Sequence, residues 1–531
     1  MALLGRYGYY TRMAGSLWKM LGTSPIEDTP GFLRRQLENR EQNFLATVRE
    51  IIFGVDGNPY REMFRVAGCE YSDLESGVNR DGLEPTLIKL LEAGVTLSHD
   101  EFKGIKTIVR NGKELRSGPE AFRNPLVKTG LVGRSGGSRS AGTPVVKSIS
   151  RLKHTDAYTS LRVREFDLVH RRIVQVRPIL PAGDGLTIAV RYKQMGCAVD
   201  RWFAPTGTSW DSAHYLLATR LLVGMTRLRG QKAPFPQLLP PNDFSAVSEY
   251  LASSIARGFP CQVGGTPSSA ARIATSALDH GHDISGTLFL TGGEPLTAAK
   301  QETIEAAGAE AYSGYWISEI GPIGWSCRAM KKGNSVHVFT DSVAVVAKAK
   351  RAPLTDIEVN SLHFTTLLPY ASFVLVNAEF DDSGHLEMGR CDCEFGRLGF
   401  HSELRDIASF GKLTGYGITL VGTHMVEILE RVLPARFGGR STDYQIVEDL
   451  AGAKTSIQLL VSPRVPTESL DTVRECFLHE IRRYQGGASA SRLLKDVEAF
   501  SVKRAEPHVT VRGKILPLHL VATRNGRGAG A

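Results

Sequence analysis

The sequence has few of the features that mark secreted or membrane-spanning proteins. Its 531 residues contain only 7 cysteines, which are unevenly spaced and do not form the pattern of a disulfide framework. The longest apolar stretch, residues 364–378, is too short to span a membrane and is interrupted by Pro369. The N-terminus is aromatic and basic but lacks an apolar segment that ends in a small-residue cleavage site. We therefore expect a cytoplasmic protein without a membrane span.

Positive charge is in excess but is not concentrated in runs. The chain carries 64 Lys and Arg against 55 Asp and Glu, a net charge of +9. Such an excess fits nucleic acid, an acidic membrane surface or an anionic small substrate. Because the basic residues are spread out and no RNA- or DNA-binding motif is present, we expect no nucleic-acid partner. A basic nucleic-acid-binding protein is the alternative, and it predicts salt-sensitive retention on polyanions.

The composition, the length and the order of helix and strand patterns predict an α/β protein of several domains. Hydrophobic residues make up 42% and charged residues 22% of the chain, the balance of a globular protein with a sizeable core. At about 150 residues per domain, the length suggests two to four domains. Strand and helix patterns alternate from residue 187 to residue 312, which indicates one continuous sheet with crossover helices.

The most informative stretch is 288–327. Residues 287–290 form an apolar run typical of a buried strand, and residues 291–295 follow as a turn whose two glycines permit close approach to a ligand. Residues 309–312 predict a second strand, and a polar and aromatic loop at 313–319 follows it. Because both strands end in Gly-rich segments, these segments are expected at the carboxyl edge of a parallel sheet, where ligands bind. Two ordinary turns of an α/β domain would have the same glycines.

Two further loops are candidates for ligand binding. Residues 131–147 mix Gly, Ser and Thr with Arg134 and Arg139 and can present N–H groups and hydroxyls to phosphates, although the spacing is not that of a Walker loop. A flexible linker has a similar composition. Residues 204–210 lead into a helix that begins near His214, and this junction can form the floor of a substrate pocket. His214 on an otherwise apolar helix is also typical of a core or surface histidine.

Four short segments occur in order along the chain: SGGSRSAGTP at 135–144, GGEP at 292–295, YWISE at 315–319 and VRGK at 511–514. Together they resemble motifs of the adenylate-forming superfamily of acyl-CoA synthetases, within it the phenylacetate–CoA ligase-like branch. They are similar to its phosphate loop, its adenine-facing turn, its Tyr-Gly-x-Thr-Glu motif and its C-terminal Gly-Lys motif. The chain departs from the family where Trp316 replaces glycine, Ser318 replaces threonine, and the lysine after the phosphate loop is displaced to Lys147.

The resemblance covers the chain from about residue 120 to residue 522 and implies its domain organisation. The expected fold is α/β, with a large N-terminal adenylate-forming domain of mixed sheets and helices and a small, mobile α+β C-terminal domain. The implied divisions are an N-terminal helical part at 1–120, the adenylate-forming core at 121–410, the small domain at 411–522 and a disordered tail at 523–531. Lys412, next to Gly411, aligns with the hinge between the two domains.

The resemblance implies an ATP-dependent, AMP-forming ligase that activates a carboxylic acid and passes the acyl group most simply to CoA. An amine, a carrier protein acting in trans or another small nucleophile are alternative acceptors. A non-catalytic nucleotide-binding homologue is a further alternative, since Trp316 and the displaced Lys147 depart from the family pattern. The identity of the acid and the oligomeric state, including a homodimer, are left open.

The same resemblance implies roles for individual residues. Glu319 would hold Mg²⁺ on the phosphates, Ser318 would hydrogen-bond a phosphate oxygen, and Lys514 would bridge the carboxylate and the α-phosphate, for which a compact charge on a long stem is suited. Asp382 would hold the ribose, with Asp381 as the alternative. The residues expected to bind ATP are Ser135, Gly136, Gly137, Ser138, Gly292, Gly293, Glu294, Pro295, Tyr315, Asp382 and Lys412. The residues expected to line the acid pocket are Thr208, His214, Gly314 and Trp316.

Four side chains of types that bind metal ions are candidates for one site, although their spacing alone is a weak signal. Cys327, His337, Cys391 and Cys393 supply three thiols and an imidazole, a tetrahedral Zn²⁺ donor set. Proteins of the phenylacetate–CoA ligase-like branch can carry a structural zinc site here, so the resemblance implies one. Free cysteines in a hydrophobic core are the alternative.

Overall fold

The computed structural model describes the chain in thirteen ranges, and the account below is confined to them. They are residues 2–134, 143–180, 182, 184–205, 210–231, 233–330, 334–352, 356–411, 421, 424–449, 456–483, 500–510 and 512–521. Among the helices within these ranges, none combines the length and the hydropathy of a transmembrane segment.

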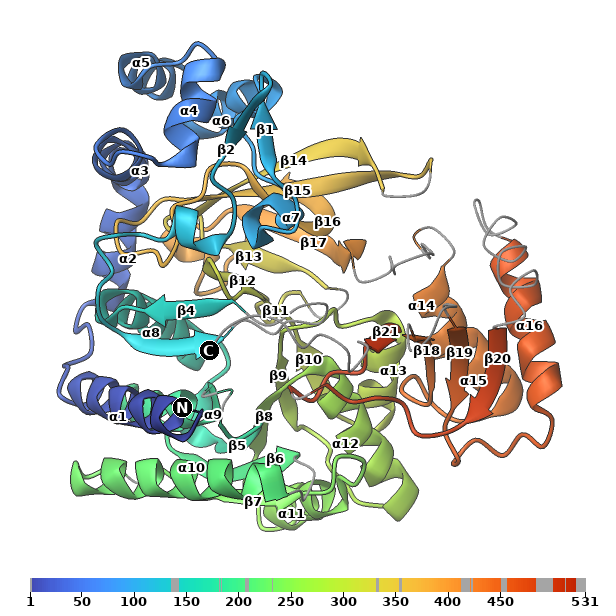
Figure 1. The fold of residues 1–531 in the computed structure, drawn as a ribbon. Helices are drawn as coiled ribbons and strands as arrows, with labels where there is room; N and C mark the ends of the chain where they lie inside the picture. The colour runs from blue at the N-terminus through green and yellow to red at the C-terminus, as the bar shows by residue number, and fades with distance from the viewer. Residues whose placement is uncertain are drawn as a thin grey trace.

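A six-stranded parallel sheet forms the centre of the molecule (Figure 1). Its order is β10-β9-β8-β5-β6-β7, so the chain proceeds from β5 to one side and then returns to fill the other side from β8 onward. The reversal between β5 and β8 is the point where open α/β sheets bind ligands, at the carboxyl ends of the strands. The strands are β5 Arg172–Val176, β6 Val199–Pro205, β7 Pro236–Leu239, β8 Cys261–Gly265, β9 Leu288–Thr291 and β10 Glu310–Tyr312.

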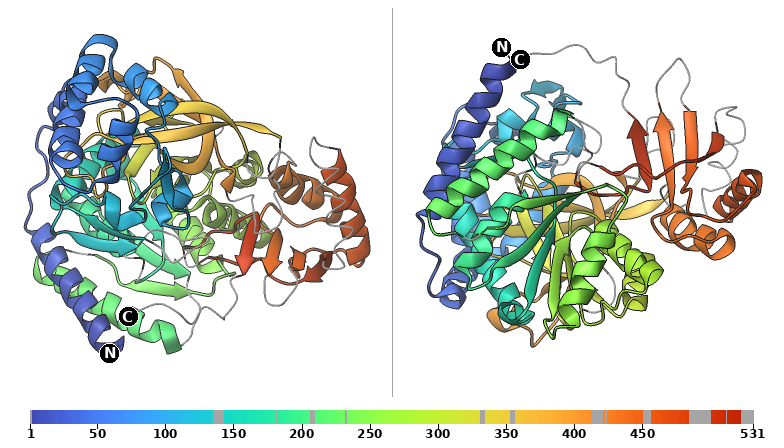
Figure 2. Two further views of the ribbon diagram at one scale, coloured as in Figure 1. Left: turned by 45° about the horizontal axis from the view of Figure 1, so that its top comes forward. Right: turned by 90° about the horizontal axis from the view of Figure 1, so that it is seen from below.

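Helices cover both faces of this sheet because its strands are apolar on both faces. In β9, Leu288 and Leu290 belong to one core cluster, whereas Phe289 between them belongs to another. The first cluster is completed by α1 Ala2–Leu21, α9 Asp184–Gln194 and α10 Trp210–Leu228, of which α1 and α10 lie side by side (Figure 2). The second is completed by α11 Ser245–Ile255, α12 Pro267–His280 and α13 Ala298–Ala306.

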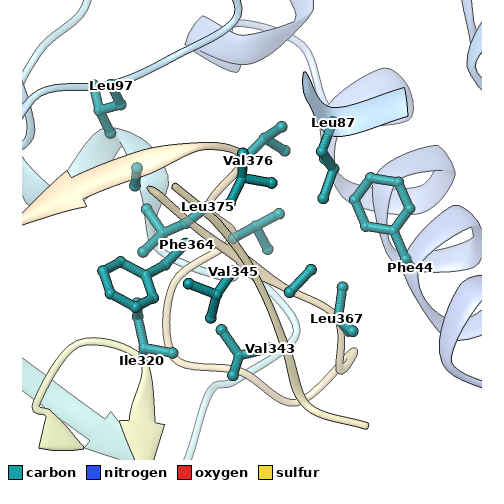
Figure 3. Close-up of a cluster of buried hydrophobic side chains, with 14 of the residues drawn as sticks. Phe44, Leu87, Leu97, Ile320, Val343, Val345, Phe364, Leu367, Leu375 and Val376 are labelled. Atoms are coloured by element: carbon teal, nitrogen blue, oxygen red, sulfur yellow. The ribbon is translucent and has the colours of Figure 1, made fainter. Parts of the chain in front are cut away.

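A seven-stranded antiparallel sheet follows in the order β11-β12-β13-β17-β16-β15-β14. The helices between residues 40 and 103 share its core, and Figure 3 shows Phe44 and Leu87 in one cluster with Val345 of a strand and Leu375 of a connecting segment. The strands are β11 Gly314–Ile317, β12 Gly321–Trp325, β13 Val336–Val338, β14 Val343–Arg351, β15 Glu358–Thr366, β16 Ala378–Met388 and β17 Ser402–Ser409. The helices are α2 Thr29–Glu38, α3 Arg40–Thr47, η1 Val48–Phe53, α4 Pro59–Val66, α5 Tyr71–Asp81, α6 Leu83–Glu92 and α7 His99–Lys103.

Two hairpins and the long helix α8 Ile149–Glu165 lead the chain from the N-terminal helices into the parallel sheet. The other elements of this connection are β1 Ile108–Arg110, β2 Lys113–Leu115, η2 Pro119–Phe122, β3 Leu131–Arg134, β4 Pro144–Lys147 and η3 Leu168–His170. A short helix, η4 Gly396–Leu398, lies between β16 and β17.

The C-terminal segment has a sheet and a core of its own and lies against α13 (Figure 1). Lys300 on α13 forms an ion pair of 2.8 Å with Glu430, and both side chains are buried in the contact between the two units. Its mixed sheet has the order β20-β19-β18-β21. The elements are α14 Met425–Glu427, η6 Ile428–Val432, α15 Leu433–Phe437, β18 Tyr444–Asp449, β19 Ser456–Val461, α16 Leu470–Arg482, β20 Phe500–Arg504 and β21 Leu518–Val521.

One local prediction is wrong. Residues 313–319 were expected to form a loop, but residues 314–317 form β11, which pairs with β12 from Gly314 opposite Trp325 to Ile317 opposite Gly321. The reason is that β12 follows after a short turn and its backbone groups form hydrogen bonds with those of residues 314–317. The polar and aromatic segment therefore becomes the edge strand of the antiparallel sheet. The strands expected at 287–290 and 309–312 are confirmed as β9, which is displaced by one residue at both ends, and β10, which begins one residue later.

Candidate functional site

The turn at 292–295 and the start of β11 meet at the carboxyl edge of the parallel sheet. A Cβ atom at position 292 would lie 2.8 Å from the carbonyl oxygen of Gly314, closer than two such atoms approach. Glycine at 292 therefore permits direct contact between the two backbones. Glu294 extends from this turn to the start of α12, where its Oε1 accepts a hydrogen bond of 2.6 Å from the N–H of Ser268. A carboxylate there is also favoured by the helix dipole.

Lys514 reaches the same turn from the C-terminal unit. Its Nζ donates a hydrogen bond to the carbonyl oxygen of Gly293. The loop that carries it is attached to the sheet edge, because the Thr266 hydroxyl, which caps α12, donates to the Gly513 carbonyl at 3.1 Å. Within the loop, the N–H of Lys514 donates to Thr510 Oγ1 at 3.1 Å. A lysine 221 residues away from Gly293 in sequence is thus positioned at the turn by tertiary contacts.

Tyr315 and Asp382 form a half-buried pair beside the turn. The Tyr315 hydroxyl donates to Asp382 Oδ2 at 2.7 Å. Burial, together with the adjacent Asp382 carboxylate, raises the pKa of Tyr315 well above its usual value, so the hydroxyl remains a donor. Asp381 instead has a left-handed backbone, with φ of 58°, and its Oδ2 lies 3.6 Å from Nδ1 of His99. The two neighbouring aspartates therefore have different partners, and Asp382 is the one paired with Tyr315.

Ser318 and Glu319 are surrounded by cations that the sequence did not indicate. Glu319 is buried and its Oε1 lies 2.8 Å from Nζ of Lys103, which also donates to Thr143 Oγ1 at 2.6 Å. Arg151 donates to the Ser318 carbonyl at 3.2 Å. Burial lowers the pKa of Arg151 to about 10, although the charge of Glu319 opposes this shift. No signal in the sequence points to Lys103, because it lies before the region of resemblance.

Removing Lys103 is expected to destabilise the protein. Its side chain is 11% exposed and that of Glu319 is 6% exposed, so Lys103→Met would leave an uncompensated carboxylate in the interior. We expect a loss of about 3 kcal/mol in the free energy of unfolding, as for other broken buried pairs. Urea denaturation followed by circular dichroism measures this loss. Lys106→Met, which changes an exposed lysine of the following turn, is the control, and equal stability of the two variants would contradict the expectation.

Trp316 and Lys147, two of the three departures from the family pattern, lie together. Nζ of Lys147 is 5.8 Å from the centroid of the Trp316 indole, within the range of a cation–π contact. Lys147 also forms an ion pair of 3.3 Å with Asp184 at the start of α9. Because Lys147 is two residues after Val145 on β4, both side chains face the same way along the strand.

Most of the expected phosphate loop and three further expected positions are outside the part of the chain that the structure describes. Ser135, Gly136, Gly137, Ser138, Thr208, Lys412 and Val511 lie outside the described residues. His214 is described, and its ring lies against that of Tyr215 with centroids 3.9 Å apart. Among the described residues, its Nε2 has no hydrogen-bond partner. Its assignment to a substrate pocket stays a prediction.

The structure brings Cys327, His337, Cys391 and Cys393 together. Their ligand atoms all lie within 4.8 Å of one another, with Cys327 Sγ at 3.7 Å from Cys391 Sγ and Cys393 Sγ at 3.3 Å from His337 Nε2. The segments that supply them are separate: the end of β12, the middle of β13 and the connection from β16 to β17. A cluster of three thiols and one imidazole can hold a metal ion, and its donors suit Zn²⁺.

The surroundings of the cluster orient its ligands. His337 Nδ1 donates to the carbonyl of Phe400 at 3.0 Å, so Nε2 is left to accept a proton or a metal ion. The Gly396 N–H donates to Cys393 Sγ at 3.3 Å. A Cβ at position 396 would lie 1.9 Å from the Cys391 carbonyl oxygen, so only glycine permits this close turn around the thiols.

Comparison with solved structures identifies the fold. The chain matches 2-hydroxyisobutyryl-CoA ligase in the postadenylation state, in complex with 2-HIB-AMP, over 95% of its own length and 94% of that chain, with a TM-score of 0.51 and 13% identity. The fold is that of an acyl-CoA ligase. Weaker matches are anthranilate CoA ligase AuaEII with anthranoyl-AMP (12% identity, 72% and 64% coverage, TM-score 0.40) and O-succinylbenzoate coenzyme A synthetase of Bacillus subtilis with ATP and magnesium (11% identity, 73% and 68% coverage, TM-score 0.36). No protein-family model and no curated protein matches the sequence.

Proposed function

We propose that this protein is an AMP-forming carboxylate ligase, which activates a carboxylic acid with ATP and transfers the acyl group to an acceptor, most simply CoA. The observation that carries the proposal is the position of Lys514. It belongs to a C-terminal unit with its own core, yet its Nζ contacts the Gly293 carbonyl at the carboxyl edge of the central sheet. The match to an acyl-CoA ligase over most of both chains supports it.

The proposed chemistry needs positive charge at this edge. A carboxylate is a poor electrophile, and attaching AMP to it creates a good leaving group. Because both reactants are anions, the site must stabilise the negative charge that develops on the α-phosphate. In the proposal, Lys514 contacts the carboxylate and the α-phosphate, Ser318 binds a phosphate oxygen, and Glu319 holds Mg²⁺, which supplies further neutralisation of the phosphates when bound.

In the proposal, the nucleotide binds to residues near the turn at 292–295. Tyr315 and the backbone of residues 292–294 would enclose adenine, and Asp382, held by the Tyr315 hydroxyl, would bind the ribose. Lys412 would be the hinge between a core at 121–410 and a small domain at 411–522, and rotation there would separate Lys514 from the turn before acyl transfer. The buried ion pair between Lys300 and Glu430 would hold the two units together during adenylation.

The proposal also assigns the chain to the phenylacetate–CoA ligase-like branch. Its support is the cluster of Cys327, His337, Cys391 and Cys393, which lies where the resemblance implies a structural zinc ion. The four residues lie on β13 and on segments that adjoin strands of the antiparallel sheet, and not at the carboxyl edge of the parallel sheet. Zinc would therefore stabilise the fold and take no part in adenylation.

Acid-dependent exchange of pyrophosphate into ATP tests the proposal. We expect exchange with some members of a panel of aryl and aliphatic acids, and formation of a thioester when CoA is added. Product analysis with CoA, with amines and with carrier proteins distinguishes the alternative acceptors. Absence of exchange across the whole panel, with ATP still bound, would instead favour a non-catalytic nucleotide-binding protein.

A further inference from the structure

A group of charges at the carboxyl end of β5 is not used by the proposed adenylation machinery. Arg177 follows β5 directly, at the point where the strand order of the sheet reverses. Asp184 begins α9, and its two carboxylate oxygens lie 3.3 Å from Nζ of Lys147 and 3.6 Å from Nη1 of Arg512. The charge of Arg177 also acts on Asp184. We call Lys147, Arg177, Asp184 and Arg512 the β5-edge cluster.

Positive charge exceeds negative charge in the β5-edge cluster. Burial alone would raise the pKa of Asp184, but Lys147, Arg512 and Arg177 lower it on balance. Burial lowers the pKa of both Lys147 and Arg177, although the charge of Asp184 opposes this shift. Three cations thus surround one carboxylate in a partly buried part of the sheet edge. A further anion would stabilise the cluster, since buried charges are normally paired.

Arg177 is the cation best placed to bind that anion. Its backbone is fixed, because its N–H donates to the Phe203 carbonyl at 3.0 Å and its carbonyl accepts from Trp202 Nε1 at 2.9 Å. Its Nε is buried and has no hydrogen-bond partner in the described part of the chain. Leaving such a donor unsatisfied is destabilising, and an anionic ligand would provide the missing acceptor.

The order of the strands places Arg177 on the acid side of the proposed site. The turn at 292–295 follows β9, Thr266 with the attached Lys514 loop follows β8, and Arg177 follows β5. Neighbouring strands are about 4.8 Å apart, so Arg177 lies about 10 Å across the sheet edge from the adenine-facing turn. An acid whose reacting carboxylate is at Lys514 and which extends away from adenine therefore points toward Arg177. Trp316, over Lys147, lies beside this path.

We propose that the acid activated by this protein carries a second anionic group, a dicarboxylate in its simplest form, which binds Arg177 and Lys147. This inference rests on the proposed function and names its substrate class. Asp184 holds Lys147 and Arg512 in position but neutralises only part of the charge. Acids without the second group leave Arg177 unpaired, and sites built around a buried polar group reject such analogues strongly.

Pyrophosphate exchange with matched pairs of acids tests the inference, for example hexanoate against adipate and benzoate against terephthalate. For the wild-type protein we expect kcat/KM to be at least about tenfold higher for the diacid of a pair, because the buried guanidinium is paired only by the diacid. Arg177→Met is expected to lower kcat/KM for the diacid about 100-fold, to change it less than about threefold for the monoacid, and to leave the KM for ATP unchanged. Arg177→Lys is expected to retain part of the preference, and it serves if the methionine variant does not fold.

Controls separate the outcomes. Arg162→Met removes another buried guanidinium with unpartnered nitrogens, which lies over the Trp325 ring, and is expected to leave the acid preference unchanged. A wild-type preference for monoacids would overturn the inference while leaving the proposed function intact. A rise in the KM for ATP in both Arg177 variants, equal for both acids, would also overturn it, because the cluster would then bind phosphate. Absence of exchange with every acid would overturn the inference together with the proposed function.

Discussion

Lys514→Ala is expected to reduce acid-dependent pyrophosphate exchange by about 100- to 1,000-fold, the range for removal of one preorganised donor from a developing negative charge. The loss arises because Lys514 is, in the proposal, the cation shared by the carboxylate and the α-phosphate, and its Nζ is already held at the Gly293 carbonyl. The measurement is the initial rate of exchange with the best acid of the panel. The effect should appear mainly in kcat, since the interaction is made most strongly in the transition state.

The control for Lys514 is another lysine of the same unit. Lys503→Ala changes an exposed residue on β20 and is expected to exchange at the wild-type rate. Both variants should unfold at nearly the same temperature as the wild type, because the backbone hydrogen bonds of Lys514 remain when its side chain is removed. Thioester formation from a preformed acyl-adenylate should survive in Lys514→Ala if the residue acts only in adenylation. Wild-type exchange by this variant would remove the observation on which the proposed function depends.

The second large effect is expected at the cysteine cluster. The wild-type protein should contain about one zinc ion per chain, as expected for a single tetrahedral site, and Cys393→Ser should lose it. We expect the variant to lose at least about 3 kcal/mol of stability, since structural zinc contributes directly to the folding free energy. The loss is large because Cys327, His337 and Cys393 connect separate segments of the antiparallel sheet. Metal analysis and thermal unfolding measure the two effects.

A second cysteine provides the comparison. Cys69→Ser removes a free thiol that is not part of the cluster, and it is expected to keep both the metal and the stability of the wild type. Treatment with a strong chelator should lower the unfolding temperature of the wild type, and added Zn²⁺ should restore it. Neither treatment should affect Cys393→Ser. A metal-free wild-type protein with unchanged stability would show that these are free core cysteines.

The cysteine cluster also shows how far a resemblance can extend sequence reasoning. The spacing of Cys391 and Cys393 alone is a weak signal, and the resemblance supplied the other two ligands. The structure confirms that the four side chains meet, because β12, β13 and β17 are neighbours in one sheet. By contrast, the segment 313–319 was misjudged, since its composition is polar and its strand character depends on pairing with β12.

Contacts between residues that lie far apart in sequence could not be predicted from sequence patterns. Lys103 pairs with Glu319 across 216 residues, and Arg512 meets Asp184 from the C-terminal unit. Lys103 belongs to no recognised motif, and the motif at 511–514 that contains Arg512 gives no indication of Asp184 as its partner. Both would be described from sequence as exposed lysine and arginine, because most such residues are solvated.

Local pattern was sufficient for the strands β9 and β10 and for the glycines of the turn between β9 and α13. These features depend on the alternation of apolar residues and on backbone conformations of neighbouring residues, which the sequence expresses directly. Charge compensation depends instead on which surfaces become buried against each other. Packing of α7 and α9 against the two sheets placed Lys103 at Glu319 and Asp184 among three cations, and within the described residues it left Nε of Arg177 buried without a hydrogen-bond partner. This arrangement of charges, on which the proposed class of acid depends, exists only in the folded chain, because water solvates every one of these groups in the unfolded chain.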